Sequence, residues 1–167
     1  MENNIKSVAV LGSGTMGAGI AALAADNNCK VLLLDISEEA VNKGKERIIN
    51  EKKPLLSNLE NHKNIDTGTF EKDFHKIKNY DWICEVVVEE INIKRDIFKK
   101  IEEHRSKTAI VSSNTSGIPL KDITKGMSEE LLKNVCITHF FNPVEVMKLC
   151  ELIPGENTDK VVINKLS

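Results

Sequence analysis

The sequence predicts an α/β fold, with a doubly wound, mostly parallel sheet that is covered by helices on both faces. Three observations carry this prediction. Short apolar runs, typical of buried strands, alternate along the chain with segments of helical periodicity. A glycine-rich turn separates the first apolar run from an alanine-rich segment. An acidic residue, Asp35, ends the second apolar run.

The first three expected elements are a strand, a helix and a second strand. Residues 5–11 and 30–34 are apolar runs that indicate buried strands, and the alanine-rich residues 15–27 between them indicate a helix. The turn after the first strand reads Gly12-Ser13-Gly14-Thr15-Met16-Gly17. The unit is therefore a crossover that begins with a G-x-G-x-x-G turn.

Each glycine of this turn has an expected role. Gly12 allows a sharp turn, Gly14 allows backbone N–H groups to approach a pyrophosphate, and Gly17 allows the helix to pack closely on the strand. The helix N-terminus would then hold the phosphates, because its free N–H groups and its dipole favour negative charge. We also expect Thr15 and Met16 to contact the cofactor. These features predict a Rossmann-type dinucleotide-binding domain.

Asp35 indicates which dinucleotide is bound. It lies 18 residues after Gly17, near the ~20-residue offset of a carboxylate that bonds the adenosine ribose hydroxyls. Because this carboxylate would repel the 2′-phosphate of NADP, we expect the cofactor to be NAD. A glycine-rich turn alone could be only a turn, but here it stands in register with two strands, a helix and the terminal acid.

Size and composition indicate one domain with a buried core, at 167 residues. Hydrophobic residues make up 41%, charged residues make up 29%, and the formal net charge is −2. This balance indicates neither a nucleic-acid partner nor a membrane-surface partner. No apolar run approaches the ~20 residues of a membrane span, and the polar N-terminus does not resemble a signal peptide. We therefore expect a cytoplasmic protein.

The four cysteines do not have the spacing of a metal site, and we expect no bound metal. Most lie in or beside apolar runs, where a free cysteine behaves as a small hydrophobic residue. We expect all four to be reduced and to lie in or near the core. They are Cys29, Cys84, Cys136 and Cys150.

The middle of the chain is less regular. Ser37 is expected to cap a helix that runs towards Lys52 and is ended by Pro54. The polar residues 53–68 fit either a loop or a loosely packed helical excursion. A short strand is expected within residues 70–77.

Strands and helices alternate again in the second half. The expected strands are residues 81–88, 109–112, 135–138 and 147–153. A helix is expected over residues 91–105, and a short element begins at residues 118–120. Residues 157–167 indicate the start of a further helix. This alternation is the basis of the mostly parallel sheet.

Four blocks of sequence together resemble the L-3-hydroxyacyl-CoA dehydrogenases. The blocks are residues 12–21, Ser113-Asn114-Thr115-Ser116, His139-Phe140-Phe141-Asn142-Pro143 and residues 147–151, in the family's order. The resemblance covers essentially the whole chain as the family's N-terminal NAD-binding domain. It implies reversible oxidation of a 3-hydroxyacyl-CoA to a 3-oxoacyl-CoA, in fatty-acid β-oxidation or a short-chain equivalent.

The resemblance implies three catalytic residues. Oxidation of an alcohol requires a base, and histidine suits this role because its ordinary pKa is ~6.5. By resemblance His139 is the base, Glu151 orients the imidazole and stabilises its cation, and Ser116 binds the substrate's 3-oxygen. Glu151 lies in an apolar run, where a charge is costly to bury without a partner. From the residues alone, each of the three also fits a structural role: a packed histidine, a solvent-facing strand glutamate and a turn serine.

The resemblance also adds Glu89, Lys94 and Asn142 to the cofactor-binding residues. From the residues alone, Glu89 and Lys94 are equally typical of solvated charges at a helix end. Asn142 precedes a proline, and the pair is equally typical of a plain turn.

In this family a C-terminal helical domain completes the substrate site, supplies an active-site asparagine and forms most of the dimer interface. We therefore expect residues 1–155 to be the NAD-binding domain and residues 156–167 to lead towards a helical domain that this sequence lacks. The parent protein is expected to be dimeric, and the isolated chain to bind NAD but turn over acyl-CoA poorly. A related β-hydroxyacid dehydrogenase and a non-catalytic NAD-binding or interaction module are the alternatives.

Overall fold

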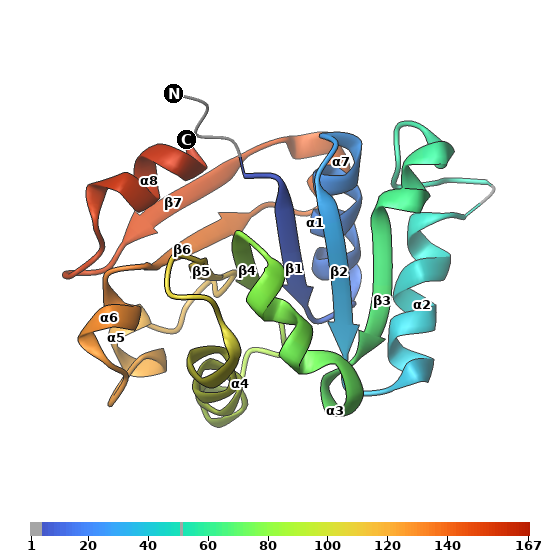
Figure 1. Ribbon diagram of the computed structural model, residues 1–167. Helices are drawn as coiled ribbons and strands as arrows, with labels where there is room; N and C mark the ends of the chain where they lie inside the picture. Colours follow the sequence, from blue (N-terminus) through green and yellow to red (C-terminus); the bar gives the residue numbers. More distant parts are fainter. Residues whose placement is uncertain (1–4, 51) are drawn as a thin grey trace.

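The computed structural model describes residues 5–50 and 52–167. Within these residues seven strands form one sheet in the order β3-β2-β1-β4-β5-β6-β7 (Figure 1). Neighbouring strands are parallel except β6 and β7, which are antiparallel. The strands are β1 Ser7–Leu11, β2 Lys30–Asp35, β3 Ile65–Thr69, β4 Trp82–Glu85, β5 Ile110–Ser113, β6 Val135–Phe140 and β7 Cys150–Pro154.

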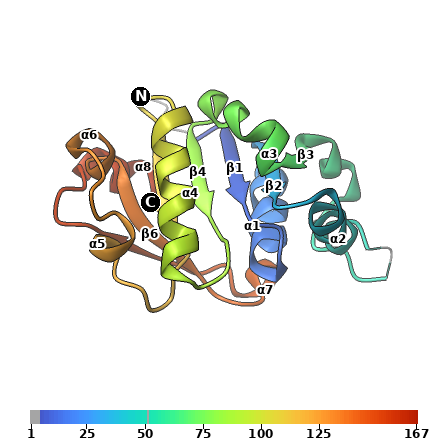
Figure 2. The same cartoon turned by 90° about the horizontal axis from the view of Figure 1, so that it is seen from below.

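Helices cover both faces of this sheet. Figure 2 shows α2 near the β3 end of the sheet and α5 and α6 near the opposite end. The α-helices are α1 Thr15–Asp26, α2 Glu38–Ile48, α3 Phe70–Asp73, α4 Ile91–His104, α5 Leu120–Ile123, α6 Glu129–Leu132, α7 Val144–Met147 and α8 Lys160–Leu166. The 3-10 helices are η1 Leu59–Asn64 and η2 Phe74–Asn79. The predicted α/β architecture is confirmed.

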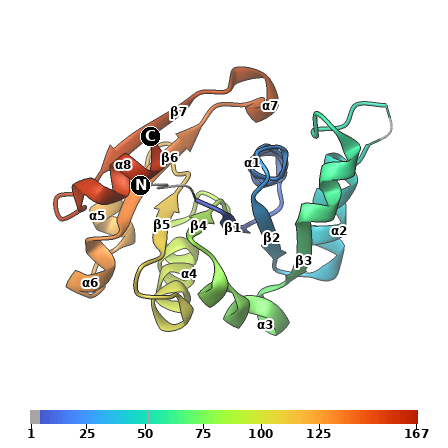
Figure 3. The same ribbon diagram turned by 45° about the horizontal axis from the view of Figure 1, so that its top comes forward.

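Alternating residues of the central strand enter two separate cores. Val8 and Val10 of β1 pack with α1 and α2 on one face. Ala9 and Leu11 pack with α4 and η2 on the other face. Figure 3 shows α1 and α4 on opposite sides of β1 and β4. This two-sided burial explains why β1 reads as a continuous apolar run, as parallel strands covered on both faces do.

The N-cap of α2 is confirmed, but the expected end of this helix is wrong. The Ser37 side chain accepts a hydrogen bond from the backbone N–H of Ala40. The helix ends at Ile48 instead of continuing towards Lys52. The Asn50 side chain accepts hydrogen bonds from the backbone N–H groups of two following residues, each at 3.0 Å, and this turn competes with helix continuation.

The strand expected within residues 70–77 is also wrong, because this segment forms α3 and η2. The side chain of Thr69 caps α3 by accepting from the backbone N–H of Lys72. Phe70 and Phe74, four residues apart, bring their ring centroids within 5.8 Å, as neighbours on one helical face do. The strand lies just before, at β3. The polar stretch 53–68, which the sequence leaves open, is a loop with η1 that leads into the first residues of β3.

Smaller differences occur in the second half of the chain. Strand β4 ends at Glu85, earlier than expected, because the Glu85 carboxylate accepts the backbone N–H of Val87 and the chain turns there. The last strand starts later than expected, since α7 precedes it and Lys148 adopts a left-handed conformation with φ 48°. Helix α8 forms as expected and buries Val162 against the sheet.

All four cysteines are free thiols, and two of them are fully enclosed in the core. Burial raises the pKa of Cys84 and of Cys136 to about 12. Because the thiolate is the reactive form, we expect an alkylating reagent to leave both unmodified in the folded protein and to modify both after denaturation. Mass spectrometry of the native and denatured protein, alkylated at mildly alkaline pH, checks this. Rapid native modification of either thiol would contradict it.

The described residues offer neither a membrane-spanning helix nor a cluster of metal ligands. None of the helices in residues 5–50 and 52–167 is long and apolar enough to cross a membrane. Over the same residues, no group of three or more His, Cys, Asp or Glu side chains is placed to hold a metal ion.

Candidate functional site

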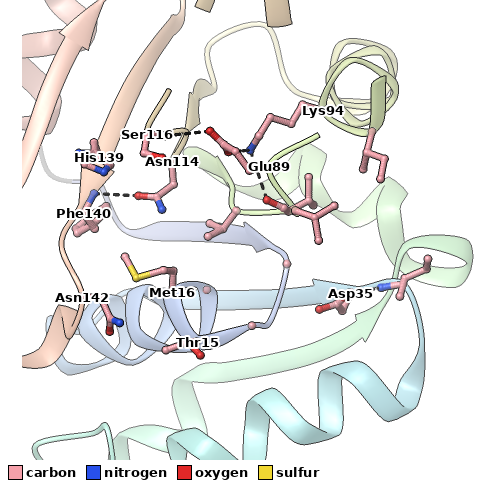
Figure 4. A pocket seen from close by; sticks show the side chains of 18 of the residues that line it. Thr15, Met16, Asp35, Glu89, Lys94, Asn114, Ser116, His139, Phe140 and Asn142 are labelled. Carbon is pink, nitrogen blue, oxygen red and sulfur yellow. Dashed lines mark hydrogen bonds and ion pairs between the residues drawn. The ribbon is translucent and has the colours of Figure 1, made fainter. Parts of the chain in front are cut away.

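A pocket of about 690 Å³ opens at the carboxyl ends of the parallel strands (Figure 4). This is the edge where doubly wound sheets bind ligands. Of the site residues expected from the sequence, all except Glu151 line the pocket. The lining residues among them are Gly12, Gly14, Thr15, Met16, Gly17, Asp35, Glu89, Lys94, Ser116, His139 and Asn142.

The glycine-rich turn forms the part of the wall next to β1. Gly12 has φ +111°, and a Cβ there would lie 2.4 Å from the carbonyl oxygen of Val86. A Cβ on Gly17 would lie 1.8 Å from the carbonyl oxygen of Gly12. A Cβ on Gly14 would meet nothing within 4 Å. Gly12 and Gly17 are therefore required by the fold itself, whereas Gly14 faces open space.

The N-terminus of α1 opens into the pocket beside Gly14, the N-cap residue. No side chain caps this helix, so its first backbone N–H groups are not bonded by a capping side chain. Free N–H groups and the helix dipole together favour an anion. The residues present therefore fit the pyrophosphate of a dinucleotide.

Asp35 is held at the rim of the pocket by the same turn. Its Oδ2 accepts hydrogen bonds from the backbone N–H and the hydroxyl of Ser13, at 2.7 and 2.6 Å. Its Oδ1 accepts the backbone N–H of Ile36 at 2.6 Å. Sequence reasoning missed Ser13, which stands at a variable position of the motif. The carboxylate is fixed in orientation and retains lone pairs for the hydroxyl groups of a ribose.

His139 and Glu151 form a pair across β6 and β7. They lie directly opposite each other in the antiparallel register, and His139 Nδ1 is 3.0 Å from Glu151 Oε2. The His139 ring also packs on Phe141, with centroids 4.8 Å apart. Among the described residues, Nε2 of His139 has no hydrogen-bond partner. An acceptor on Nδ1 fixes the tautomer in which Nε2 is free to accept a proton.

Glu151 pairs with His139, but its charge is not buried. Its side chain is 54% exposed, and it does not line the pocket. The physical reason is that β7 is an edge strand. Within residues 5–50 and 52–167, Glu151 therefore contacts the site only through His139.

Ser116 lies in the loop after β5, on the pocket wall, where the side chain of Asn114 also lies (Figure 4). The Asn114 side-chain oxygen accepts the backbone N–H of Phe140 at 2.9 Å and so ties this loop to β6 beside His139. Sequence reasoning named Ser116 from this block but missed Asn114. An asparagine in a turn gives no signal that its side chain reaches another strand.

Lys94 is not a solvated helix-end charge. Its side chain is 1% exposed, and its Nζ lies 2.8 Å from Glu85 Oε1 and 3.2 Å from Glu89 Oε2. Burial opposes ionisation of Glu89, but hydrogen bonds from Thr115 and Lys94 and the charge of Lys94 hold its pKa below the usual value. Sequence reasoning missed Glu85, whose only signal was a glutamate inside an apolar run.

Comparison with known proteins gave a consistent result. The family model described as "3-hydroxyacyl-CoA dehydrogenase, NAD binding domain" matches residues 7–167. A probable 3-hydroxyacyl-CoA dehydrogenase of Bacillus subtilis is 38% identical over 98% of this chain and 23% of its own length. A protein of the same description from Deinococcus radiodurans is 37% identical over 98% of this chain and 49% of its own length.

Solved structures agree with these sequence matches. The crystal structure of 3-hydroxybutyryl-CoA dehydrogenase from Escherichia coli has a TM-score of 0.83 and 33% identity, over 98% of this chain and 35% of that one. A Ralstonia eutropha (S)-3-hydroxybutyryl-CoA dehydrogenase has a TM-score of 0.82 and 31% identity, over 97% of this chain and 58% of that one. The chain therefore spans only part of the length of the proteins it resembles.

Proposed function

The chain belongs to the 3-hydroxyacyl-CoA dehydrogenase family as its NAD-binding domain, and on this premise we propose that it holds NAD for the oxidation of an L-3-hydroxyacyl-CoA to a 3-oxoacyl-CoA. The observation that carries the proposal is the shared pocket. Its wall joins an uncapped glycine-turn helix to a histidine that is paired with a glutamate. We propose fatty-acid β-oxidation, or its short-chain equivalent, as the setting.

The pocket residues suggest how the cofactor is held. The N-terminus of α1 binds the pyrophosphate, and Asp35 accepts the ribose hydroxyls at one end of the pocket. The opposite end, bounded by Ser116, His139 and Asn142, is left for the nicotinamide. Bound NAD supplies the acceptor for the hydride that leaves C3 of the substrate.

The reaction also releases the proton of the substrate hydroxyl, and His139 Nε2 accepts it. Glu151 holds the proton on Nδ1 and stabilises the imidazolium that forms. Ser116 donates a hydrogen bond to the 3-oxygen, where negative charge develops as the O–H bond breaks. The roles of these three residues are proposals.

The resemblance to the family also supports a further domain. We propose that residues 1–155 form the NAD-binding domain and that residues 156–167 lead into a C-terminal helical domain. That domain would complete the acyl-CoA site and form the dimer interface. A cytoplasmic location stays a prediction.

Cofactor preference tests the first half of the proposal. Asp35→Ala removes charge-assisted hydrogen bonds worth about 1.5–3 kcal/mol, so we expect NAD affinity to fall roughly 10- to 100-fold. NADP affinity should rise or stay constant, because the charge that repels its 2′-phosphate is gone. Calorimetric titration of the chain with both cofactors measures this. Asp66→Ala, an exposed carboxylate of β3 outside the pocket, is the control and should change neither affinity. Equal binding of NAD and NADP by the unmodified chain would refute the preference.

The class of substrate tests the second half of the proposal, the oxidation of an acyl-CoA. A polypeptide that carries this chain together with the proposed C-terminal domain is expected to reduce NAD with 3-hydroxybutyryl-CoA and not with free 3-hydroxybutyrate. The reverse preference would favour a related β-hydroxyacid dehydrogenase. NAD binding without activity on either substrate would favour a non-catalytic module.

A further inference from the structure

A buried carboxylate lies behind the pocket wall and takes no part in the proposed chemistry. Glu85, the last residue of β4, is 0% exposed and does not line the pocket. Its Oε1 accepts hydrogen bonds from Lys94 Nζ and from the backbone N–H of Val87, both at 2.8 Å. Its Oε2 accepts the hydroxyl of Ser113 at 2.5 Å. Both carboxylate oxygens therefore have hydrogen-bond partners inside the protein.

The ammonium group of Lys94 continues this network. It donates to Glu85, lies 3.2 Å from Glu89 Oε2 and contacts the carbonyl oxygen of Val87 at 3.4 Å. A lysine ammonium has three protons. Each of the three has an acceptor within the protein, so Lys94 holds the groups around it in place.

Glu89 connects Lys94 to the loop after β5. Its Oε1 accepts the hydroxyl of Thr115 at 2.5 Å and the backbone N–H groups of Ser116 and Gly117 at 3.2 and 3.3 Å. Figure 4 shows Lys94, Glu89 and Ser116 in this order along the pocket wall. A continuous chain of contacts therefore runs from Glu85 to Ser116.

A second contact joins Glu85 to the same loop. The Ser113 hydroxyl, which donates to Glu85, also accepts the backbone N–H of Thr115 at 3.2 Å. Ser113 is 0% exposed and, like Glu85, does not line the pocket. The loop that carries Ser116 is thus held from two directions by one buried carboxylate.

A buried ion pair is a poor source of stability, because desolvation of both charges offsets their attraction and apolar side chains would do as well. Such a pair does fix geometry, because a lost contact leaves a buried charge without a partner. Resting on the proposed NAD function, we propose that Glu85 is a positioning residue: through Lys94, Glu89 and Ser113 it fixes the Ser116 loop at the nicotinamide end of the pocket.

The test compares NADH with ADP-ribose, which retains the adenosine, ribose and pyrophosphate groups but lacks nicotinamide. Glu85→Gln and Ser113→Ala alter the network without removing a pocket-lining residue. The matched control is Ser112→Ala: Ser112 is also 0% exposed in β5, but its hydroxyl bonds Trp82 and Thr138. Calorimetric titration of the 167-residue chain with both ligands gives the affinities, and thermal melting confirms that each variant is folded.

We expect NADH affinity to fall about fivefold in Ser113→Ala and about tenfold or more in Glu85→Gln, by the loss of one neutral and one charged hydrogen-bond partner. ADP-ribose affinity should stay within about twofold in both, and Ser112→Ala should change neither ligand. If Glu85→Gln does not fold, the Ser113→Ala and Ser112→Ala comparison decides.

Two other outcomes overturn the inference. Equal weakening of both ligands would mean that Glu85 supports the whole pocket, and no change in either would mean that it serves only the fold. Failure of the proposed NAD function would give a different result from failure of this inference. The unmodified chain would then bind neither NADH nor ADP-ribose.

Discussion

Gly14→Ala is expected to weaken NAD binding roughly 30- to 100-fold while leaving the domain folded. A Cβ at this position meets nothing within 4 Å in the protein, and the residue has φ −64°, which alanine adopts without strain. The added methyl group would instead occupy the space through which the pyrophosphate approaches the helix N-terminus. Overpacking of this kind costs about 2–3 kcal/mol, which gives the expected loss of affinity.

Gly17→Ala, three residues along the same turn, is expected to destabilise the fold, whereas Gly14→Ala leaves the domain folded. Its Cβ would lie 1.8 Å from the carbonyl oxygen of Gly12, so the helix and the turn must move apart. We expect the free energy of unfolding to fall by about 3 kcal/mol or more. A loss of that size lowers the melting temperature by roughly 10 °C in a domain of this length.

Melting curves and NAD titrations of the two variants form one experiment in which each serves as the control of the other. The turn acts as a cofactor cradle only if binding and stability separate between them. A Gly14→Ala variant that binds NAD as tightly as the unmodified chain would mean that no pyrophosphate approaches there.

The glycine turn was predictable because its rules are local. The three glycines have their roles within six residues, and the fingerprint describes one sharp turn and two close approaches that a side chain would block. The helix and strand that follow agree with the prediction to within one residue for the same reason. The strand prediction for residues 70–77 is wrong because a short run with two phenylalanines fits both the strand period and the helical period. The packing of Phe70 on Phe74 selects the helix.

The rest of the site depends on contacts between distant segments. Glu151 lies opposite His139 because β7 runs antiparallel to β6 at the edge of the sheet, a position that sequence alone does not assign. Glu85 was not singled out, because its partners Lys94 and Ser113 come from the next helix and the next strand. Sequence patterns identify which residues line the pocket far better than they identify which residues hold them in place.

The second large effect is expected at His139. In a polypeptide that carries this chain and the proposed C-terminal domain, His139→Ala should lower kcat by about 10²- to 10⁴-fold, the usual contribution of a general base. NAD affinity should stay within about twofold, because the imidazole is needed for the hydroxyl proton and not for the pyrophosphate or the adenosine ribose. Steady-state kinetics and calorimetric NAD titration measure the two quantities separately.

Glu151→Gln separates a catalytic pair from a structural one. The amide keeps the shape of the side chain but loses the negative charge that stabilises the imidazolium, so kcat should fall while the melting temperature stays nearly constant. We expect about 10²-fold, below the loss of about 10⁴-fold for a buried triad aspartate, because Glu151 is half exposed and water screens its charge. Glu156→Gln, an exposed glutamate just after β7, is the control and should leave kcat unchanged. If both His139→Ala and Glu151→Gln retained full turnover, the pair would only join β6 to β7, and the base would have to lie elsewhere on the pocket wall.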